Sequence, residues 1–453
     1  MRRRVILKAL LGSGAVSALG GLGVLGTRAA AQGAAGSPAA EPYSLSYAAG
    51  GYDSRGNFLG GTELMNLTAF GGRLYAGVGY WMDRPAVFAA GYEQRGPAGP
   101  GNAQVLVLDS RGSQWRQEYA FGQAHRLSAM EIVRFPRANV AMLAVGLDSG
   151  NGGVFTQRAP GVWENTGVPT QTPIRSLAVH YDTADGREKL FAATGGAEDR
   201  YFDRAVYAGS YDPGAPGRIR WDPTPERVSA EARTMSMTEC DGVLYAAAKP
   251  SIYRRNDARR GWEVLYTNPI SDSFGHTHFT SGFRGLTCIA GPDGRHALLS
   301  GFEGTEGNIY RIDVQTGAAT TELYTRRFLA QQWGGEPTRP NVIAGYNDIP
   351  EVAAGVRVFG LAAQSPTDPT AAWFLSRTDG NPPRYALHKV SAPARWPYSR
   401  SDTQLWSVRQ IALSPFPEDQ NQVLYMGGYD GHFAPDHNTA WLYRVGLQTA
   451  LAH

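Results

Sequence analysis

The stretch Arg233–Ser251 reads RTMSMTECDGVLYAAAKPS, and it aligns without a gap with ELMNLTAFGGRLYAGVGYW, Glu63–Trp81. Each stretch has a short apolar run, a turn that contains glycine, and a second run that ends in small residues. Two such runs around a turn predict an antiparallel hairpin. Because the two stretches lie far apart in the chain, they also indicate an internal repeat.

The same unit begins five more times, at Arg126, Arg175, Arg284, Asn347 and Arg409. Most units continue with a second pair of strands, and the clearest of these pairs cover residues 103–121, 251–267, 307–325 and 371–390. Four strands per unit, at a spacing of roughly 40–60 residues, are typical of β-propeller blades. The sequence therefore predicts an all-β fold, a seven-bladed β-propeller with four antiparallel strands per blade.

We expect the remaining N-terminal segment, Tyr43–Asp53, to add a strand to the last blade and close the ring. Closure removes exposed sheet edges, which would otherwise pair with other chains. No segment has a helical periodicity strong enough to suggest an α/β fold. A pair of β-sandwiches is the alternative architecture.

The N-terminus predicts export. Residues 1–31 have a basic start, an apolar Gly/Ala-rich middle and the small-residue exit Ala29–Ala31. Arg3–Lys8 resembles the twin-arginine pattern, which implies Tat export of a folded protein. We expect a flexible linker over 32–42, a single propeller domain over 43–453, and a periplasmic or extracellular location. An uncleaved membrane anchor is the alternative; no later stretch is long and apolar enough to span a bilayer.

Composition excludes some partners. The chain has 453 residues and a formal net charge of +3, with no basic runs, which argues against nucleic-acid binding. We expect a monomer with no membrane contact after signal cleavage. Cys240 and Cys288 match no zinc motif. They could be two buried free thiols, which we favour, or a disulfide, which an oxidising compartment permits.

Arginine opens five of the seven inner strands: Arg126, Arg175, Arg233, Arg284 and Arg409. The other two open with Glu63 and Asn347–Asp348. In a propeller these positions surround one mouth of the channel, so the arginines predict a positively charged pocket for an anionic ligand. Alternatively, the arginines could bridge neighbouring blades by pairing with Glu63, Asp348 or backbone carbonyls.

Loops on the same face bring histidine and aromatic residues. Histidine titrates near neutrality and aromatic rings stack on sugars, so these types suit glycan chemistry. The predicted catalytic residues are His276, His278, Arg284, His125 and Tyr80. The predicted substrate-binding residues are Arg126, Arg175, Arg233, Arg409, Trp81, Glu63 and His432.

Other roles for the histidines remain open. His276 and His278 point the same way in an extended segment, so they could hold a divalent metal together with His432 or His437. They could equally have no role. His180 and His296 are expected on the opposite face and are interpreted as structural.

Four segments together carry a resemblance: GGYDSRGNFLGGTE (50–63), LYAGVGYWMD (74–83), YNDIPEV (346–352) and GGYDGHFAPDHNTAWLYR (427–444). They are similar to secreted seven-bladed propellers of microbial polysaccharide breakdown, the rhamnose–glucuronate lyases and their glycosidase-like relatives. The resemblance implies an anionic, uronate-bearing glycan as substrate. None of the family's catalytic residues is carried over to this chain.

β-Elimination at a uronate needs a neutralised carboxylate and a base. Arg284 or Arg175 could neutralise the carboxylate, and His276, His278 or His125 could remove the proton. Tyr80 could protonate the leaving oxygen.

Two other classes stay open. One is a non-enzymatic propeller that binds a glycan or a protein at the channel mouth. The other is a quinone or metal oxidoreductase. G-x-S-x-G, P-loop and H-E-x-x-H motifs are missing.

Overall fold

The computed structural model describes residues 37–80, 102–122, 124–148, 153–195, 204–228, 233–269, 282–291, 294–303, 306–342, 349–369, 371–391, 405–430 and 438–452. The chain divides into two units, Met1–Gly36 and Ser37–His453, and the description concerns the second. The predicted export signal, residues 1–31, lies outside the described residues and stays a prediction.

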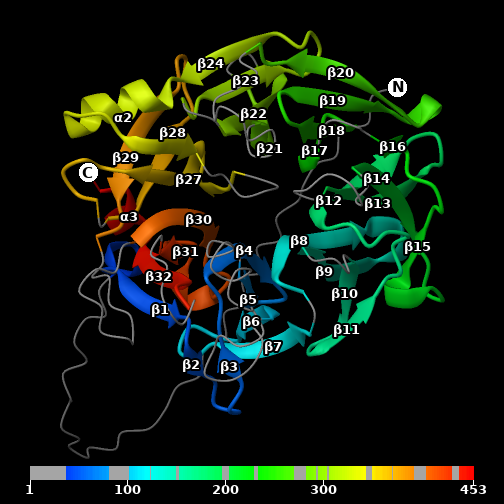
Figure 1. The fold of residues 1–453 in the computed structure, drawn as a ribbon, viewed down its shortest axis with the longest axis horizontal. Helices are drawn as coiled ribbons and strands as arrows, with labels where there is room; N and C mark the ends of the chain where they lie inside the picture. The colour runs from blue at the N-terminus through cyan, green and yellow to red at the C-terminus, as the bar shows by residue number, and fades with distance from the viewer. Residues whose placement is uncertain are drawn as a thin grey trace, which may run out of the picture. The chain divides into compact units, whose positions relative to one another are not determined.

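The described residues form an all-β fold of antiparallel strands joined mainly by hairpins (Figure 1). The first strand group contains β4 Glu63–Phe70, β5 Arg73–Gly79, β6 Ala103–Leu108 and β7 Arg116–Phe121. The second contains β8 Arg126–Phe135, β9 Val140–Asp148, β10 Val154–Ala159 and β11 Val162–Asn165. The third contains β12 Ile174–Asp182, β13 Arg187–Thr194, β14 Ala205–Tyr211, β15 Ile219–Trp221 and β16 Arg227–Val228.

The next two groups follow the same order of pairing. The fourth contains β17 Thr234–Cys240, β18 Val243–Ala248, β19 Ser251–Asn256 and β20 Gly261–Thr267. The fifth contains β21 Gly282–Ala290, β22 His296–Glu303, β23 Ile309–Asp313 and β24 Ala319–Leu323. The outer hairpins predicted over 103–121, 251–267 and 307–325 are confirmed by these pairings.

Two further groups complete the described fold. The sixth contains β25 Thr338–Val342, β26 Glu351–Ala353, β27 Val356–Gln364, β28 Trp373–Thr378 and β29 Arg384–Lys389. The seventh contains β30 Leu405–Leu413, β31 Val423–Asp430, β32 Trp441–Gly446 and β1 Ser44–Ala48. A small hairpin stands apart, made of β2 Gly51–Tyr52 and β3 Phe58–Leu59.

The N-terminal segment pairs with the C-terminal part of the chain. β1 runs antiparallel to β32, with Ser44 opposite Arg444. Single pairs also join neighbouring groups, Ala362 with Ser407 and Tyr429 with Glu63. Through these pairs the sixth, seventh and first groups form one continuous 13-stranded sheet.

The sixth group departs from the expected repeat. Its inner strand was predicted to begin at Asn347, but β25 and β26 both pair with β27, so this strand is divided in two. A short helix, α2 Thr325–Trp333, precedes it and buries Leu329 against Ile349 and Phe359. The other described α-helix is α3 Leu447–Leu451, and no helix in the described part of the chain could cross a bilayer.

From the seventh group through the first to the fifth, the first strand of each group packs against the first strand of the next one. In Figure 1, β8, β12, β17 and β21 lie toward the middle of the view, and their fourth strands lie toward its edge. Glycines make this approach close: a Cβ atom on Gly79 would overlap Arg126, and one on Gly146 would overlap Ile174. A larger residue at either position would push two groups apart.

Polar bridges between outer strands reinforce this packing at three junctions. In each, a side chain on a third strand reaches a glutamate from the preceding group. The pairs are Gln157 with Glu118 at 2.9 Å, Arg255 with Glu226 at 2.7 and 2.8 Å, and Arg377 with Glu322 at 2.7 and 3.1 Å. These buried charge-assisted bonds depend on both partners being present.

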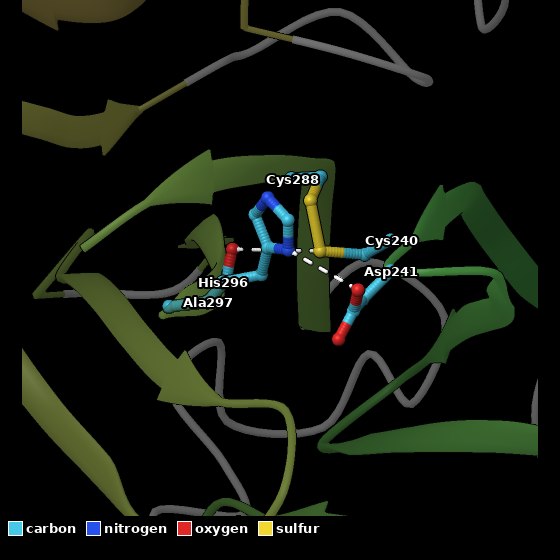
Figure 2. Close-up of a disulfide and its surroundings, with 5 residues drawn as sticks. All are labelled: Cys240, Asp241, Cys288, His296 and Ala297. Atoms are coloured by element: carbon cyan, nitrogen blue, oxygen red, sulfur yellow. Dashed lines mark hydrogen bonds and ion pairs between the residues drawn. A yellow bond between two sulfur atoms is a disulfide. The ribbon is translucent and has the colours of Figure 1, made fainter. Parts of the chain in front are cut away.

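The two cysteines form a disulfide, so our prediction of free thiols is wrong. Cys240 ends β17 and Cys288 lies in β21, and the packing of these strands brings their Cα atoms to 5.2 Å (Figure 2). That separation lies within the range that a disulfide bridges. Strand packing between the fourth and fifth groups, rather than sequence spacing, determines the bond.

We predict that replacing both cysteines with alanine lowers the free energy of unfolding by about 4 kcal/mol. The bond closes a loop of 48 residues, and its loss gives the unfolded chain back the entropy of that loop. Denaturant unfolding of the double variant measures the change. Wild-type protein treated with a reductant serves as the comparison and should lose a similar amount; a reduced protein as stable as the oxidised one would contradict the prediction.

Candidate functional site

Four of the predicted arginines lie at or near the starting ends of the first strands, whereas Arg409 is the central residue of β30; all five are largely buried. We use the name rim cluster for Glu63, Arg126, Arg175, Arg233 and Arg409. Their exposed fractions are low, from 0% for Glu63 to 8% for Arg233, with the Arg409 side chain at 10%. Buried charges of this number require hydrogen-bond or ion-pair partners.

The arginines do not share one position in the strand, contrary to our expectation. Six of the first strands contain an extra residue, a β-bulge, and β30 contains two. Arg175 and Arg409 are themselves the extra residues, whereas Arg126 and Arg233 precede the bulge by two positions. A bulge changes the alternation of side chains, so sequence alignment could not show this difference.

Glu63 binds two of the arginines. Its Oε1 lies 3.2 Å from Nη1 of Arg126, and its Oε2 lies 3.0 Å from Nη2 of Arg409. Glu63 belongs to the first group, while Arg126 and Arg409 come from the second and seventh. One fully buried carboxylate therefore joins three strand groups, and its role in this structure is to position two guanidinium groups.

Arg175 extends the cluster to the third and fourth groups. Its Nε donates to the carbonyl of Gly195 at 2.6 Å, and its Nη1 donates to Oγ of Ser128 at 3.5 Å. Gly195 also lies directly against Arg233, because a Cβ atom added there would overlap the Arg233 Cβ. Arg175 and Arg233 therefore both contact Gly195.

Arg284 pairs within its own group. Its guanidinium forms an ion pair with Glu303, the last residue of β22, and Arg284 is 6% exposed. Unlike the four arginines of the rim cluster, it comes just before the bulge of its strand. The alternative reading, in which arginines bridge neighbouring groups by pairing with Glu63, describes Arg126 and Arg409. Arg284 bonds to Glu303 of its own group, and Arg175 bonds to the Gly195 carbonyl of its own group.

Two methionines form the apolar part of the rim. Met65 and Met235 are the extra residues of β4 and β17, and they pack together as a separate buried cluster. Nη2 of Arg409 lies 3.2 Å from Sδ of Met65. The charged groups therefore border an apolar contact between the first and fourth groups.

Tyr80 and His125 lie side by side next to Arg126. The backbone N–H of Tyr80 donates to the carbonyl of His125 at 2.8 Å. The Tyr80 hydroxyl donates to Oδ1 of Asn438 at 3.0 Å, and Tyr80 is 6% exposed. To protonate a leaving group, Tyr80 would have to exchange this bond for one to the substrate.

Several predicted site residues lie outside the described residues: His276, His278, Trp81, His432 and His437. Among the residues that the structure describes, no group of three or more His, Cys, Asp or Glu side chains could hold a metal ion. The predicted metal ligands His276, His278, His432 and His437 lie outside the described residues, so the metal site stays a prediction.

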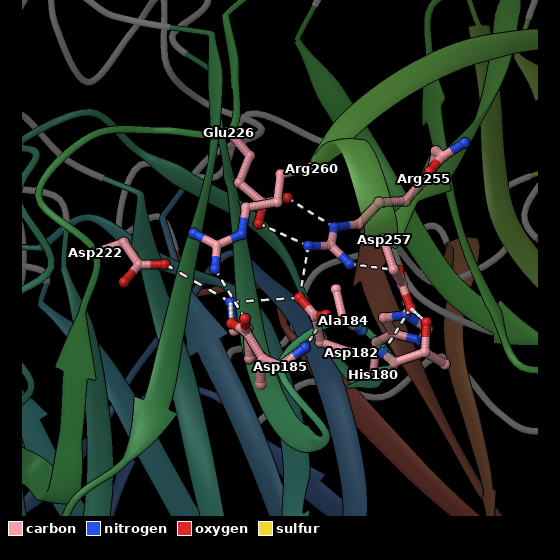
Figure 3. A network of polar contacts seen from close by, with 12 residues as sticks. His180, Asp182, Ala184, Asp185, Asp222, Glu226, Arg255, Asp257 and Arg260 are labelled. Carbon is pink, nitrogen blue, oxygen red and sulfur yellow. Dashed lines mark hydrogen bonds and ion pairs between the residues drawn. The ribbon is translucent and has the colours of Figure 1, made fainter.

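A second charged network, which sequence analysis missed, joins the third and fourth groups (Figure 3). Arg255 contacts Asp182 at 2.8 Å in addition to Glu226 and Asp257, and Lys189 lies 3.3 Å from Asp182. One sequence feature could have indicated this network. The run Arg254–Asp257 lies at the end of the third strand of its group, and the end of β12 and the turn after it carry Asp182 and Asp185.

His180 lies at the edge of this network with its side chain fully buried. Nδ1 is 2.6 Å from Oε2 of Glu239, and Nε2 is 3.0 Å from Oδ1 of Asp257. Burial lowers the pKa of His180, but the hydrogen bonds to Glu239 and Asp257 raise it further than burial lowers it, so the pKa is above its usual value. The ring is a buried bridge between two carboxylates.

We predict that Glu63→Gln lowers the free energy of unfolding by about 3–5 kcal/mol, because two buried guanidinium groups lose the charge between them. Glu263→Gln is the matched control. Glu263 also contacts two arginines, Arg254 at 3.2 Å and Arg259 at 3.6 Å, but its side chain is 40% exposed. The control should lose about 1 kcal/mol or less. Equal losses in denaturant unfolding would refute the assigned role of Glu63.

We predict that His180→Gln destabilises the protein more at about pH 5.5 than at about pH 8.5. The raised pKa means that the folded chain holds the proton more tightly than the unfolded chain. This stabilisation is complete below the unfolded pKa of about 6.5 and disappears as the pH rises through the folded value. Unfolding midpoints across pH measure it, with His296→Gln as an exposed control; a pH-independent difference would contradict the prediction.

Comparison with known proteins finds no matching family model and no matching curated protein. Solved structures do match. One, described as the extracellular domain of a hybrid two-component system from B. thetaiotaomicron, has a TM-score of 0.48 at 12% identity over 89% of this chain. The chain spans 39% of the length of that protein.

A protein of unknown function from Dyadobacter fermentans has a TM-score of 0.41 at 9% identity, over 90% of this chain and 98% of its own. A structure described as an exo-β-1,3-galactanase from Bifidobacterium bifidum has a TM-score of 0.31 at 10% identity, over 61% of this chain and 96% of its own. At these scores none of the three assigns an activity to this chain.

Proposed function

We propose that residues 43–453 form a closed, seven-bladed β-propeller that is exported and binds an anionic, uronate-bearing glycan at the rim cluster. The pairing of β1 with β32 supports closure, because it joins the two ends of the domain. The disulfide supports export, because such bonds persist in oxidising compartments.

Further support for the propeller comes from a hollow of about 280 Å³ at the far ends of the first strands. Residues from four strand groups line it, and they include Asn66, Met130, Glu351 and Gln410. A second hollow of about 320 Å³ shares Glu131 and Ile132 with the first and reaches Ala178 and Glu239. First strands that border shared hollows are the arrangement expected around a propeller channel.

The binding proposal rests on one observation: the single carboxylate of Glu63 forms ion pairs with both Arg126 and Arg409 and holds their guanidinium groups in place. Arg175 and Arg233 lie next to each other in the same set of strand ends. Guanidinium groups held rigidly in a water-poor site bind carboxylates well, because little ordering remains to be done on binding. The Met65–Met235 contact would place an apolar surface beside the charged group of the glycan.

β-Elimination is the second candidate, and the contact between Tyr80 and His125 beside Arg126 favours it. In this reaction an arginine neutralises the uronate carboxylate and a histidine removes the proton α to it. The electron pair forms a carbon–carbon double bond, the glycosidic C–O bond at the β carbon breaks, and Tyr80 protonates the leaving oxygen. His276, His278 and His125 are the proposed bases. A non-enzymatic receptor would use the same arginines without a base.

We predict that Arg175→Gln weakens binding of glucuronate-bearing oligosaccharides by tenfold or more, about 1.4 kcal/mol. The reason is the loss of a guanidinium held at the rim by Gly195 and Ser128. Calorimetric titration measures affinity, and a thermal melt verifies folding. Arg187→Gln is the control, since Arg187 is exposed and lies at the far end of β13.

Two outcomes would reject the binding proposal: equal affinity for neutral and uronate-bearing oligosaccharides, or unchanged affinity in Arg175→Gln. Ultraviolet absorbance of the unsaturated product then separates enzyme from receptor. Product formation that His125→Gln or His278→Gln abolishes, without loss of binding, would support β-elimination. Binding without any product would support the receptor.

A further inference from the structure

A separate hollow of about 300 Å³ lies at the far end of the fifth strand group. Its lining residues come from the β21–β22 turn, from β22, from β23 with its following turn, from β24, and from one residue of the sixth group. They include Arg295, His296, Arg311, Thr320 and Asn381. Ligand pockets in proteins start at about this volume, so the hollow suits a molecule the size of one sugar.

Arg311 is one of the two arginines that line this hollow, together with Arg295. Its Nε lies 3.3 Å from Oε1 of Glu322, which is its one ion pair within the described part of the chain. Glu322 already accepts two hydrogen bonds from Arg377 and one from the Tyr385 hydroxyl, at 2.8 Å for the last. The Arg311 side chain is 30% exposed. Its terminal nitrogens are therefore available to a ligand.

His296 adds a second nitrogen donor. Its Nδ1 lies 3.5 Å from Oδ1 of Asp241, and the other ring nitrogen points away from that carboxylate (Figure 2). The side chain is 45% exposed. The Cys240–Cys288 disulfide lies beside it and joins the two groups that carry Asp241 and His296. The imidazole is thus held on a covalently fixed part of the fold.

One carboxylate, Asp313, also lines the hollow, but its Oδ1 is engaged by its own turn. That atom accepts hydrogen bonds from N–H of Gln315 at 2.9 Å, N–H of Thr316 at 2.8 Å and the Thr316 hydroxyl at 2.9 Å. The bonds from Thr316, together with the charge of Arg295, lower the pKa of Asp313. Asp313 is therefore an ionised carboxylate whose Oδ1 is occupied by three donors of its own turn, while Arg311 and His296 line the same space.

We propose that this hollow binds an oxyanion, a carboxylate, sulfate or phosphate group carried by a small molecule, with Arg311 and His296 as the charged and polar donors. Thr320 and Asn381 would hydrogen-bond the remaining polar atoms of the ligand. Guanidinium and imidazole groups recognise oxyanions by charge-assisted hydrogen bonds. The site lies away from the starting end of β21. Arg284 is near that end and Ala290 ends the strand beside the hollow, and six residues of extended strand span about 20 Å.

The experiment titrates the full chain with sodium sulfate, inorganic phosphate and sodium glucuronate, each separately. The readout is the NMR signal of the His296 imidazole, assigned by its loss in His296→Gln. We expect a saturable shift with at least one of the three anions, and the anion that binds tightest identifies the group that the site prefers. In Arg311→Gln the shift should need at least tenfold more anion.

Arg259→Gln is the matched control, because Arg259 is 78% exposed and lies in the fourth group. It should leave the titration unchanged. If Arg311→Gln does not fold, Arg311→Lys keeps the charge without the planar fork and should bind detectably but more weakly. An absence of saturation with all three anions, or an unchanged titration in Arg311→Gln or Arg311→Lys, would overturn the proposal. Because the readout is local to His296, its result does not depend on whether the rim binds a glycan.

Discussion

The close approach of successive first strands is the constraint on which the remaining structure depends. Where the second strand of one group ends, a glycine such as Gly79 or Gly195 lets the next first strand lie against it. A side chain there would separate the groups, and the contacts across them would be lost. Glu63 could then no longer reach both Arg126 and Arg409.

The first strands also explain why so much charge is buried. Each carries hydrophobic residues into the space between groups, while bulges redirect individual side chains. Arg175 and Arg409 are such redirected residues. Burying their guanidinium groups is unfavourable without partners, and the observed partners are a shared carboxylate, a backbone carbonyl and a hydroxyl. The rim is thus a rigid set of donors.

Polar bonds on the outer strands serve a different purpose. Gln157, Arg255 and Arg377 each reach a glutamate of the preceding group, and the Arg255 network adds Asp182, Asp257 and His180. These groups are enclosed between strands, so they fix how two groups pack and do not face a ligand. Arg311 differs, because its glutamate is occupied by Arg377 and its own side chain remains partly exposed.

The hairpins could be predicted from the sequence, because pairing between adjacent strands leaves a local pattern of apolar runs and turn residues. The hairpins over 103–121, 251–267, 307–325 and 371–390 were predicted in this way. The addition of β1 to the last group was predicted from the N-terminal segment that the repeats leave over. The sequence also indicated that arginines open many first strands.

The strand groups that these side chains contact follow from tertiary packing and could not be predicted from the sequence. The sharing of Glu63, the Cys240–Cys288 bond and the hollow at Arg311 depend on how strand groups pack together. Those contacts join residues that are often more than fifty positions apart, such as Arg409 and Glu63. No periodicity along the chain records such a contact, because it arises from the packing of whole strand groups.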